Sequence, residues 1–295
     1  MRQEIRKIQE SMEAADYVTD APVATAVHLA MTLRKPLLIE GHAGVGKTEV
    51  AKVMARMLGT NLIRLQCYEG LDASTALYEW NYQKQLLHIK LQEGSTVSAT
   101  EKEAQIFSEP FLLKRPLLQA ITQETAPVLL VDEIDRADEE FEAFLLEIFS
   151  EWQITIPEVG TIKAAHPPNV ILTSNRTREL SDALRRRCLY LWVDYPSFEK
   201  EVRIVERKVP GVNARVAREI ARFMETLRTV RLAKVPGVAE SLDWAQALTA
   251  LHADHLDAEL VAETLGCVLK DADDIKRFKG EVASAGLGKF VPRQG

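Results

Sequence analysis

The sequence has 295 residues, 46% hydrophobic and 27% charged, which is enough for one large domain or two smaller ones. Its 37 Lys and Arg against 43 Asp and Glu give a net charge of −6 without a long basic block, which disfavours nucleic-acid binding. Three widely separated cysteines argue against a disulfide framework. Since neither a signal-peptide core nor an apolar run of about 18 residues is present, we expect a cytoplasmic protein without a membrane span.

The N-terminal part carries two amphipathic helical patterns, the second over Ala21–Leu33. A short apolar strand then leads into Gly41–Thr48, whose Gly-x-x-x-x-Gly-Lys-Thr spacing is that of a phosphate-binding loop. Glycines let the backbone amides surround phosphate oxygens, and a helix beginning at Lys47 directs its free N-terminal amides at the same anion. Lys47 adds a charge for the outer phosphates, and Thr48 offers a hydroxyl to Mg²⁺.

Four later apolar segments predict the other strands of a parallel sheet: Leu62–Cys67, Val128–Val131, Val170–Ser174 and Cys188–Val193. Between the second and third strands, residues 68–110 do not follow the alternation of strands and helices, which indicates an insertion. We expect a helix over Ala73–Ile89, a polar loop over Gly94–Thr100 and, next, a helix over Phe111–Gln123. The aromatic residues Tyr78, Trp80 and Tyr82 either pack in the core or line a pore or partner surface.

A helix over about Asp138–Phe149 and a hairpin over Gln153–Lys163 separate the third and fourth strands. After Pro196 the alternation of strands and helices ends. The remaining patterns predict helices over Ser197–Val209, Asn213–Val230, Ser241–Ala253, Asp257–Lys270 and Asp271–Ala283. The expected fold class is therefore α/β, with a nucleotide-binding domain at 1–196 and a smaller all-α domain at 197–295.

Paired acids follow the third strand, where the carboxyl ends of parallel strands meet. Asp132 is expected in the Mg²⁺ shell opposite Thr48, and Glu133 is expected to polarise the attacking water. Asn175, after the fourth strand, either orients that water or forms an Asx turn. The alternative for the acids is a solvated surface, which we expect for most of residues 135–142, with Asp138 as a helix cap.

Three arginines, Arg185, Arg186 and Arg187, follow a short helical turn before the fifth strand. Such a cluster is commonly a solvated or anion-binding face. Here an arginine could also reach the nucleotide of a neighbouring subunit and neutralise the charge on the γ phosphate. Spacing alone does not decide which of the three does so.

In this order the motifs resemble those of the AAA+ ATPases, over residues 17–285: Gly41–Thr48 is similar to Walker A, Val128–Glu133 to Walker B and Asn175 to sensor 1. The resemblance implies ATP and Mg²⁺ as cofactors, an AAA+ P-loop core with sheet order 5-1-4-3-2, a helical lid and a homo-hexameric ring. It also implies the arginine finger at Arg187, with Arg186 as second candidate. The nucleotide-binding residues that it implies are Val18, Gly41, His42, Ala43, Gly44, Val45, Gly46, Lys47, Thr48 and Glu49, with Val18 at the adenine.

Within the AAA+ proteins the chain looks like the MoxR group, through the insertion after the second strand and the hairpin over Gln153–Lys163. More narrowly, Tyr68–Asp72 and Glu240–Ala245 are similar to accessory ATPases of carbon monoxide dehydrogenase maturation. The resemblance implies a chaperone for metallocofactor insertion or complex assembly, a partner with a von Willebrand factor A domain and a metalloenzyme client. One departure is that the sensor 2 position, within Ala239–Asp243, holds no arginine; Arg228 or Arg231 would then have to replace it.

Other functions remain open at this point. A small-molecule P-loop kinase would not need Asn175, the three arginines or a separate lid. A nucleotide-gated adaptor with little turnover is favoured by the missing sensor 2 arginine and disfavoured by Glu133. A GTPase would carry an Asn-Lys-x-Asp motif, which the sequence lacks, and the acidic balance disfavours a DNA-loading relative.

Overall fold

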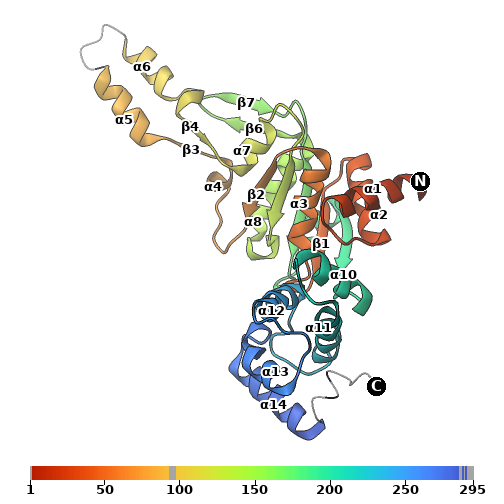
Figure 1. Cartoon of the computed structure of the whole chain (residues 1–295). Coiled ribbons are helices and arrows are strands. Elements are labelled where there is room, and N and C mark those ends of the chain that lie inside the picture. Colours follow the sequence, from red (N-terminus) through yellow and green to blue (C-terminus); the bar gives the residue numbers. More distant parts are fainter. Residues whose placement is uncertain (1, 93–97, 286–287, 289, 291–295) are drawn as a thin grey trace. The chain divides into compact units, whose positions relative to one another are not determined.

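The computed structural model describes residues 2–92, 98–285, 288 and 290 (Figure 1). The chain forms two compact units, which its backbone enters more than once. The first unit consists of Met1–Ala21, Gly41–Val50 and Trp192–Gly295, and the second consists of Pro22–Glu40 and Ala51–Leu191. The domain boundary near residue 196 stays a prediction.

A five-stranded sheet organises the second unit. Its strands are β1 (Leu37–Gly41), β2 (Leu62–Gln66), β5 (Val128–Asp132), β8 (Asn169–Ser174) and β9 (Leu189–Val193). Their spatial order, β2-β5-β8-β1-β9, is the predicted order 5-1-4-3-2 read from the other end. The pairs β2–β5, β5–β8 and β8–β1 are parallel. Every residue of β1 and β5 is buried, which explains their continuous apolar sequences.

One face of this sheet packs against helices that lie between its strands in the chain. Leu129 and Val131 of β5, with Leu172 of β8, form a cluster with apolar residues of α7 (Pro116–Ile121), α8 (Glu139–Glu151) and α9 (Asp182–Arg187). The helices α2 (Ala21–Leu33) and α3 (Lys47–Leu58) precede and follow β1, as expected. Between α8 and β8, β6 (Gln153–Ile156) and β7 (Gly160–Lys163) form the predicted antiparallel hairpin.

The insertion differs from the prediction. The helix expected over Ala73–Ile89 is interrupted, since α4 (Ala73–Leu77) and α5 (Tyr82–Leu91) flank the strand β3 (Tyr78–Trp80). β3 pairs with β4 (Leu112–Lys114), so Phe111–Gln123 is not one helix either; α7 begins at Pro116, a residue suited to a first helical position. Cross-strand pairing between segments more than 30 residues apart overrides the local helical pattern.

We call residues 78–92 and 98–114 the arm. In the second unit, α5 and α6 (Ala99–Ile106) extend side by side from the β3–β4 ribbon (Figure 1). The polar loop expected over Gly94–Thr100 falls mostly on residues 93–97, outside the described residues, and Ser98 caps α6. Trp80 is buried as core packing predicts, but Tyr82 is 62% exposed.

The first unit is mainly helical. It contains α1 (Arg2–Ala14), α10 (Phe198–Lys208), α11 (Ala214–Leu227), α12 (Val238–Ala250), α13 (Ala258–Thr264) and α14 (Ala272–Ala285). Trp244, Phe223 and Phe278 lie at the centre of its apolar core. The helix predicted over Asp257–Lys270 is shorter than expected, since it passes into a 3₁₀ turn (Leu265–Cys267) around Gly266.

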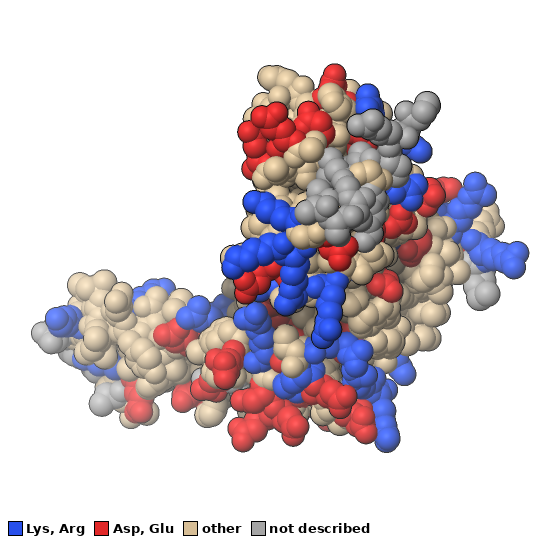
Figure 2. Space-filling view, turned by 90° about the horizontal axis from the view of Figure 1, so that it is seen from below, with Lys and Arg blue, Asp and Glu red and all other residues tan. Residues whose placement is uncertain are grey.

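Charges of both signs occur on the surface. On the face drawn in Figure 2, Lys and Arg side chains lie among groups of Asp and Glu side chains. Such a mixed face differs from the single-sign surface that is typical of nucleic-acid-binding proteins. No helix in the described part of the chain is long and apolar enough to cross a membrane.

Candidate nucleotide site

The phosphate loop lies in the first unit and is curled around its own lysine. Gly44 and Gly46 have φ angles of +73° and +93°, which side-chain-bearing residues rarely adopt. Lys47 is 6% exposed, and its Nζ donates hydrogen bonds to the carbonyl oxygens of Gly41 (2.9 Å) and His42 (2.6 Å). The loop therefore holds one buried cation within a turn of glycine-dependent backbone.

The start of α12 packs against this loop. The backbone amide of Val238 donates to the Gly44 carbonyl oxygen at 2.9 Å. A Cβ on Gly237 would lie 2.7 Å from the Ala43 carbonyl oxygen, so no larger residue fits without a shift. From the sequence, Gly237 is expected only between the helices predicted over Asn213–Val230 and Ser241–Ala253. The sequence offers one sign of this contact, a glycine directly before a helix. Such a glycine is informative only when it is known that the phosphate loop packs against it.

The other predicted nucleotide-binding residues also belong to the first unit. The ring of His42 stacks on Tyr195, with centroids 4.5 Å apart. Val18 is 5% exposed, and Thr48 is half-buried at the start of α3. Glu49 lies 3.6 Å from the Lys208 ammonium. Tyr17 sits in the same region, where burial, and then the charges of Asp20 and Glu49, raise the pKa of its phenol.

In the second unit, the predicted acids Asp132 and Glu133 lie at the carboxyl end of β5, beside the neighbouring strand β8. Asp132 is 2% exposed; its Oδ1 accepts a hydrogen bond from the Thr173 hydroxyl (2.5 Å), and its Oδ2 accepts one from Arg64 Nε (3.0 Å). Both carboxylate oxygens therefore have partners from the neighbouring strands β8 and β2. A nearly buried carboxylate beside a guanidinium marks this strand end as a site that favours positive charge.

Glu133 is held differently. Its backbone is left-handed, with φ +56°, and its amide donates to the Thr173 hydroxyl at 3.0 Å. One carboxylate oxygen accepts from Gln66 Nε2 at 3.1 Å and lies 3.0 Å from Arg136 Nε. Gln66 also accepts a hydrogen bond from Arg64, the residue that pairs with Asp132, so one network links the two carboxylates. The sequence analysis singled out neither Gln66 nor Arg136.

The expectation of a solvated acidic face is wrong for Asp135 and Glu142, which are 2% and 0% exposed. Asp135 accepts hydrogen bonds from the Asn175 amide (3.2 Å) and from the amide and hydroxyl of Thr177. Burial acts to raise the pKa of Asp135, but the hydrogen bonds, chiefly from Thr177, lower it overall. Glu142 pairs with Arg178 on the segment after β8. These contacts fix the segment that carries Asn175.

The three arginines have different surroundings. Arg185 pairs at 2.8 Å with Glu40, a residue at the end of β1 that is 1% exposed. Arg187 donates to the Leu146 carbonyl oxygen (2.9 Å) near the end of α8. Arg186 is exposed, and no hydrogen bond or ion pair of its side chain is found within the described residues. Two of the three thus stabilise the second unit itself. The role of Glu40 was not predicted from the sequence.

Comparison with known proteins agrees with this geometry. A family model described as AAA domain (dynein-related subfamily) matches residues 36–188, about half of the chain. The chain belongs to this AAA family. Its sequence is 26% identical over 218 residues to uncharacterized proteins of Staphylococcus haemolyticus and of Staphylococcus aureus, covering 72% of this chain and 75% of each relative.

The AAA domain also resembles solved structures. Two mutant forms of Thermotoga maritima RuvB align with TM-scores of 0.50, at 19% and 18% identity; the alignments cover 93% and 94% of this chain and 76% of each structure. At this identity the likeness shows the fold alone. It agrees with an α/β AAA+ P-loop core followed by helices. The family match includes the phosphate loop, both acids, Asn175 and the three arginines, whereas the helical region after residue 188 lies outside it.

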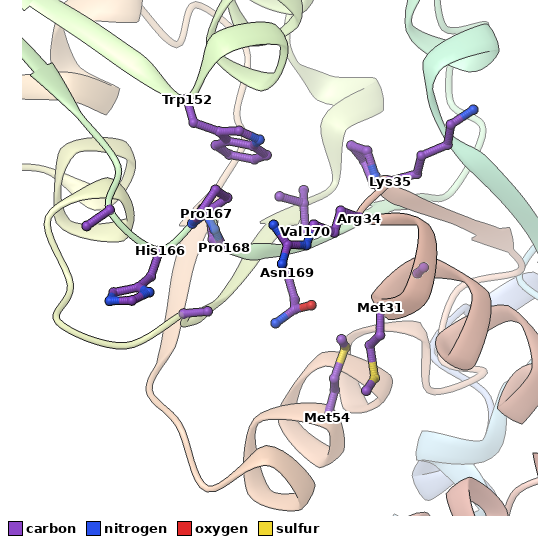
Figure 3. Close-up of a pocket in the computed structure, with 14 residues that line it drawn as sticks. Met31, Arg34, Lys35, Met54, Trp152, His166, Pro167, Pro168, Asn169 and Val170 are labelled. Atoms are coloured by element: carbon purple, nitrogen blue, oxygen red, sulfur yellow. The ribbon is translucent and has the colours of Figure 1, made fainter. Parts of the chain in front are cut away.

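A separate cavity of about 460 Å³ lies at the opposite edge of the sheet in the AAA domain (Figure 3). Pro36 and Asn169, at the amino ends of β1 and β8, line it together with Met31, Arg34 and Trp152. No residue that the sequence analysis singled out for the nucleotide is among its lining residues. This cavity is therefore distinct from the predicted nucleotide site.

Proposed function

We propose that the protein is an ATP-hydrolysing, MoxR-like AAA+ chaperone that remodels a client protein. The observation that carries the proposal is the pair Asp132 and Glu133 at the carboxyl end of a fully buried central strand, with differently fixed side chains. A solvated acidic surface would need neither the buried Asp132 nor the left-handed turn at Glu133. β1, in the same sheet, leads directly into the phosphate loop.

The residues present fit Mg²⁺ and a nucleoside triphosphate. Thr48 and Asp132 would supply the hydroxyl and carboxylate oxygens that Mg²⁺ prefers. Asp132 already attracts the Arg64 guanidinium, which supports its preference for a cation. Bound Mg²⁺ would neutralise charge on the phosphates. Lys47 and the loop amides would bind the phosphates, with Gly41–Glu49 around them and Val18 at the adenine.

Glu133 is proposed as the base that orients and deprotonates the attacking water, with Asn175 positioning that water. In the structure, Gln66 and Arg136 engage the Glu133 carboxylate. Turnover would therefore require at least one of these contacts to open. This arrangement is compatible with a resting state whose base becomes available only when the site is loaded.

Arg186 is the best supported candidate for a finger that acts on a neighbouring subunit. Arg185 and Arg187 each make contacts within their own chain, with Glu40 and Leu146, whereas Arg186 projects from α9 into solvent. An arginine acting in trans implies an assembly in which each site borders the next subunit. We propose a homo-hexameric ring, as in many AAA+ proteins.

The finer assignment to metallocofactor maturation rests on the resemblance to the MoxR group. The insertion, with its protruding arm, and the β6–β7 hairpin support it. We propose a metalloenzyme as client and a protein with a von Willebrand factor A domain as partner. Within the described residues, no cluster of three or more His, Cys, Asp or Glu forms a metal site.

The decisive variant is Glu133→Gln. We expect it to bind ATP normally and to lose turnover by about 100-fold or more, the usual contribution of a general base. Glu139→Gln, on the exposed first turn of α8, is the matched control and should leave turnover unchanged. Near-normal turnover in Glu133→Gln would contradict the assignment of the base.

A nucleotide-gated adaptor is the second candidate. It is favoured by the contacts that hold Glu133 and by the Arg228 guanidinium, which is engaged by Glu201 and so does not replace the missing sensor 2 arginine in this conformation. ATP binding without measurable turnover in the unmodified protein, with and without a candidate client, would favour this function.

A further inference from the structure

Helix α5 of the arm exposes an unusual amount of apolar surface. Five of its ten residues are large apolar side chains that are 44–75% exposed: Tyr82, Leu86, Leu87, Ile89 and Leu91. At 100° per residue, Tyr82, Leu86 and Ile89 form one stripe, and Leu87 and Leu91 form a second, about 150° further around the helix. Exposed apolar side chains in this number on one short helix are typical of interaction surfaces.

The opposite face of α5 already has partners in the arm. Gln85 is buried, and its amide donates to the Ile106 carbonyl oxygen of α6 at 2.7 Å. Lys84 donates to the Pro110 carbonyl oxygen at 2.7 Å. The exposed face is thus an additional surface and not the remainder of an unfinished core. Lys90 lies between its two apolar stripes, and α5 contains no acidic residue.

A groove of complementary character lies between α8 and β6 in the same unit. Its volume is about 570 Å³, and Phe144, Leu146 and Ile154 contribute apolar walls. Glu147 and Glu151, both exposed, are the acids that line it. The groove therefore offers apolar side chains with two carboxylates and the guanidinium of Arg187, which is bonded to Leu146, whereas the exposed face of α5 offers apolar side chains with one ammonium group.

We propose that α5 of one subunit docks into the α8–β6 groove of a second copy of this chain, with Lys90 facing Glu147 and Glu151. Insertion of an amphipathic helix into an apolar groove is a common mode of recognition, anchored at i, i+4 and i+7 positions. A contact between two different surfaces of identical chains is head-to-tail, and repetition of such a contact can close a ring. This inference rests on the ring of the proposed function.

A lipid surface fits the arm less well. Glu101 and Glu103 lie on α6, which packs beside α5, and an anionic membrane would repel them. Docking in the groove also has a consequence for the arginine segment. Arg187 lines the groove and is bonded to Leu146. An occupied groove would therefore fix the end of α9, next to Arg186.

The test is a charge exchange, measured as molecular mass by light scattering with ATP and Mg²⁺ in the Glu133→Gln background. We expect Lys90→Glu alone, and Glu147→Lys with Glu151→Lys, each to weaken assembly about tenfold. The protein with all three changes should regain most of that loss. Lys279→Glu makes the same charge change on exposed α14 and should assemble like the parent.

Leu87→Ala, which leaves charge unchanged, should also weaken assembly about tenfold. Unchanged assembly of Lys90→Glu and Leu87→Ala would overturn the docking while leaving the ring intact. Loss of assembly without recovery in the combined variant would show that α5 contacts a different surface, and would overturn it too. A parent protein that binds ATP but stays monomeric would refute the ring and the docking together. Binding of anionic vesicles that Leu87→Ala abolishes would favour a membrane instead.

Discussion

The buried pair of Glu201 and Arg228 gives a quantitative test of what holds the helical unit together. Arg228 donates to both carboxylate oxygens of Glu201, at 2.6 and 2.8 Å. The two side chains are 1% and 8% exposed. The Ser241 hydroxyl donates to the same carboxylate at 2.5 Å, and Arg228 Nε donates to the Pro236 carbonyl oxygen at 3.0 Å. This network joins α10, the end of α11 and the start of α12.

Glu201→Gln keeps the side-chain shape but leaves the Arg228 charge uncompensated. Removing one partner of a buried ion pair lowers the free energy of unfolding by roughly 3–5 kcal/mol. Because the amide oxygen of the new glutamine can still accept one hydrogen bond, we expect a loss of about 3 kcal/mol. With a urea m-value of about 1.5 kcal/mol/M, the unfolding midpoint of this unit should fall by about 2 M. Replacing both residues, as Glu201→Leu with Arg228→Met, should recover most of the loss, because no unpaired charge stays buried.

The assay is urea unfolding followed by ¹⁹F NMR of protein labelled with fluorotryptophan. The four tryptophans give separate signals, and Trp244 reports on the core of the helical unit. Glu199→Gln, on the exposed first turn of α10, is the control and should shift the midpoint little. A loss below about 1 kcal/mol in Glu201→Gln, or a double variant as unstable as the sum of the two single losses, would refute the reasoning.

Three further predictions follow from single contacts. Gly237→Ala should weaken ATP binding at least about tenfold in calorimetric titrations, because its Cβ would collide with the phosphate loop. Asp135→Asn should lower the free energy of unfolding by about 2 kcal/mol at pH 7. The pKa of Asp135 in the folded protein lies below its usual value of 3.8, so the carboxylate stabilises the protein fully above pH 3.8, and this stabilisation is lost as the pH falls through the folded pKa. Arg186→Ala should lower turnover about 1,000-fold without loss of stability, whereas Arg187→Ala should lower stability by about 1 kcal/mol.

Each of these predictions has a contrary outcome. Gly266→Ala, at a position where a Cβ meets nothing within 4 Å, is the control for Gly237→Ala, and equal affinities would contradict the steric argument. Urea midpoints with the same acid dependence in Asp135→Asn as in the parent would exclude Asp135 as the titrating group. Normal turnover in Arg186→Ala, together with a loss of turnover in Arg187→Ala, would assign the arginine finger to Arg187 instead.

Several parts of the fold follow from sequence because their causes are local. The glycine spacing in Gly41–Thr48 reflects the left-handed backbone angles that a phosphate-binding loop requires. The unbroken apolar run of β5 reflects the burial of this strand on both faces. Parallel strands must be joined by crossovers, so alternation of strands and helices predicts this class of sheet. The resemblance supplied the strand order, which the structure confirms.

The arm and the acidic segment could not be derived in this way. β3 forms only because β4, about 30 residues later, offers it a partner, whereas the local pattern of Ala73–Ile89 is compatible with a helix. In the sequence, Asp135 does not differ from other acidic residues that follow a strand. In the structure it is buried, and hydrogen bonds from the backbone amides of Asn175 and Thr177 compensate that burial. The charge and hydropathy of one segment do not reveal which distant hydrogen-bond donors will offset the cost of burying such a carboxylate.

By itself, the sequence determined the phosphate loop, the strand that ends in Asp132 and Glu133, and the helical character of residues 197–285, since backbone sterics and periodicity act over a few residues. Only the tertiary structure decided that Glu40 holds Arg185, that Gly237 packs on the phosphate loop and that α5 keeps an apolar face exposed. Burial, pairing and close approach depend on residues that are far apart in the chain, and folding alone brings those residues together.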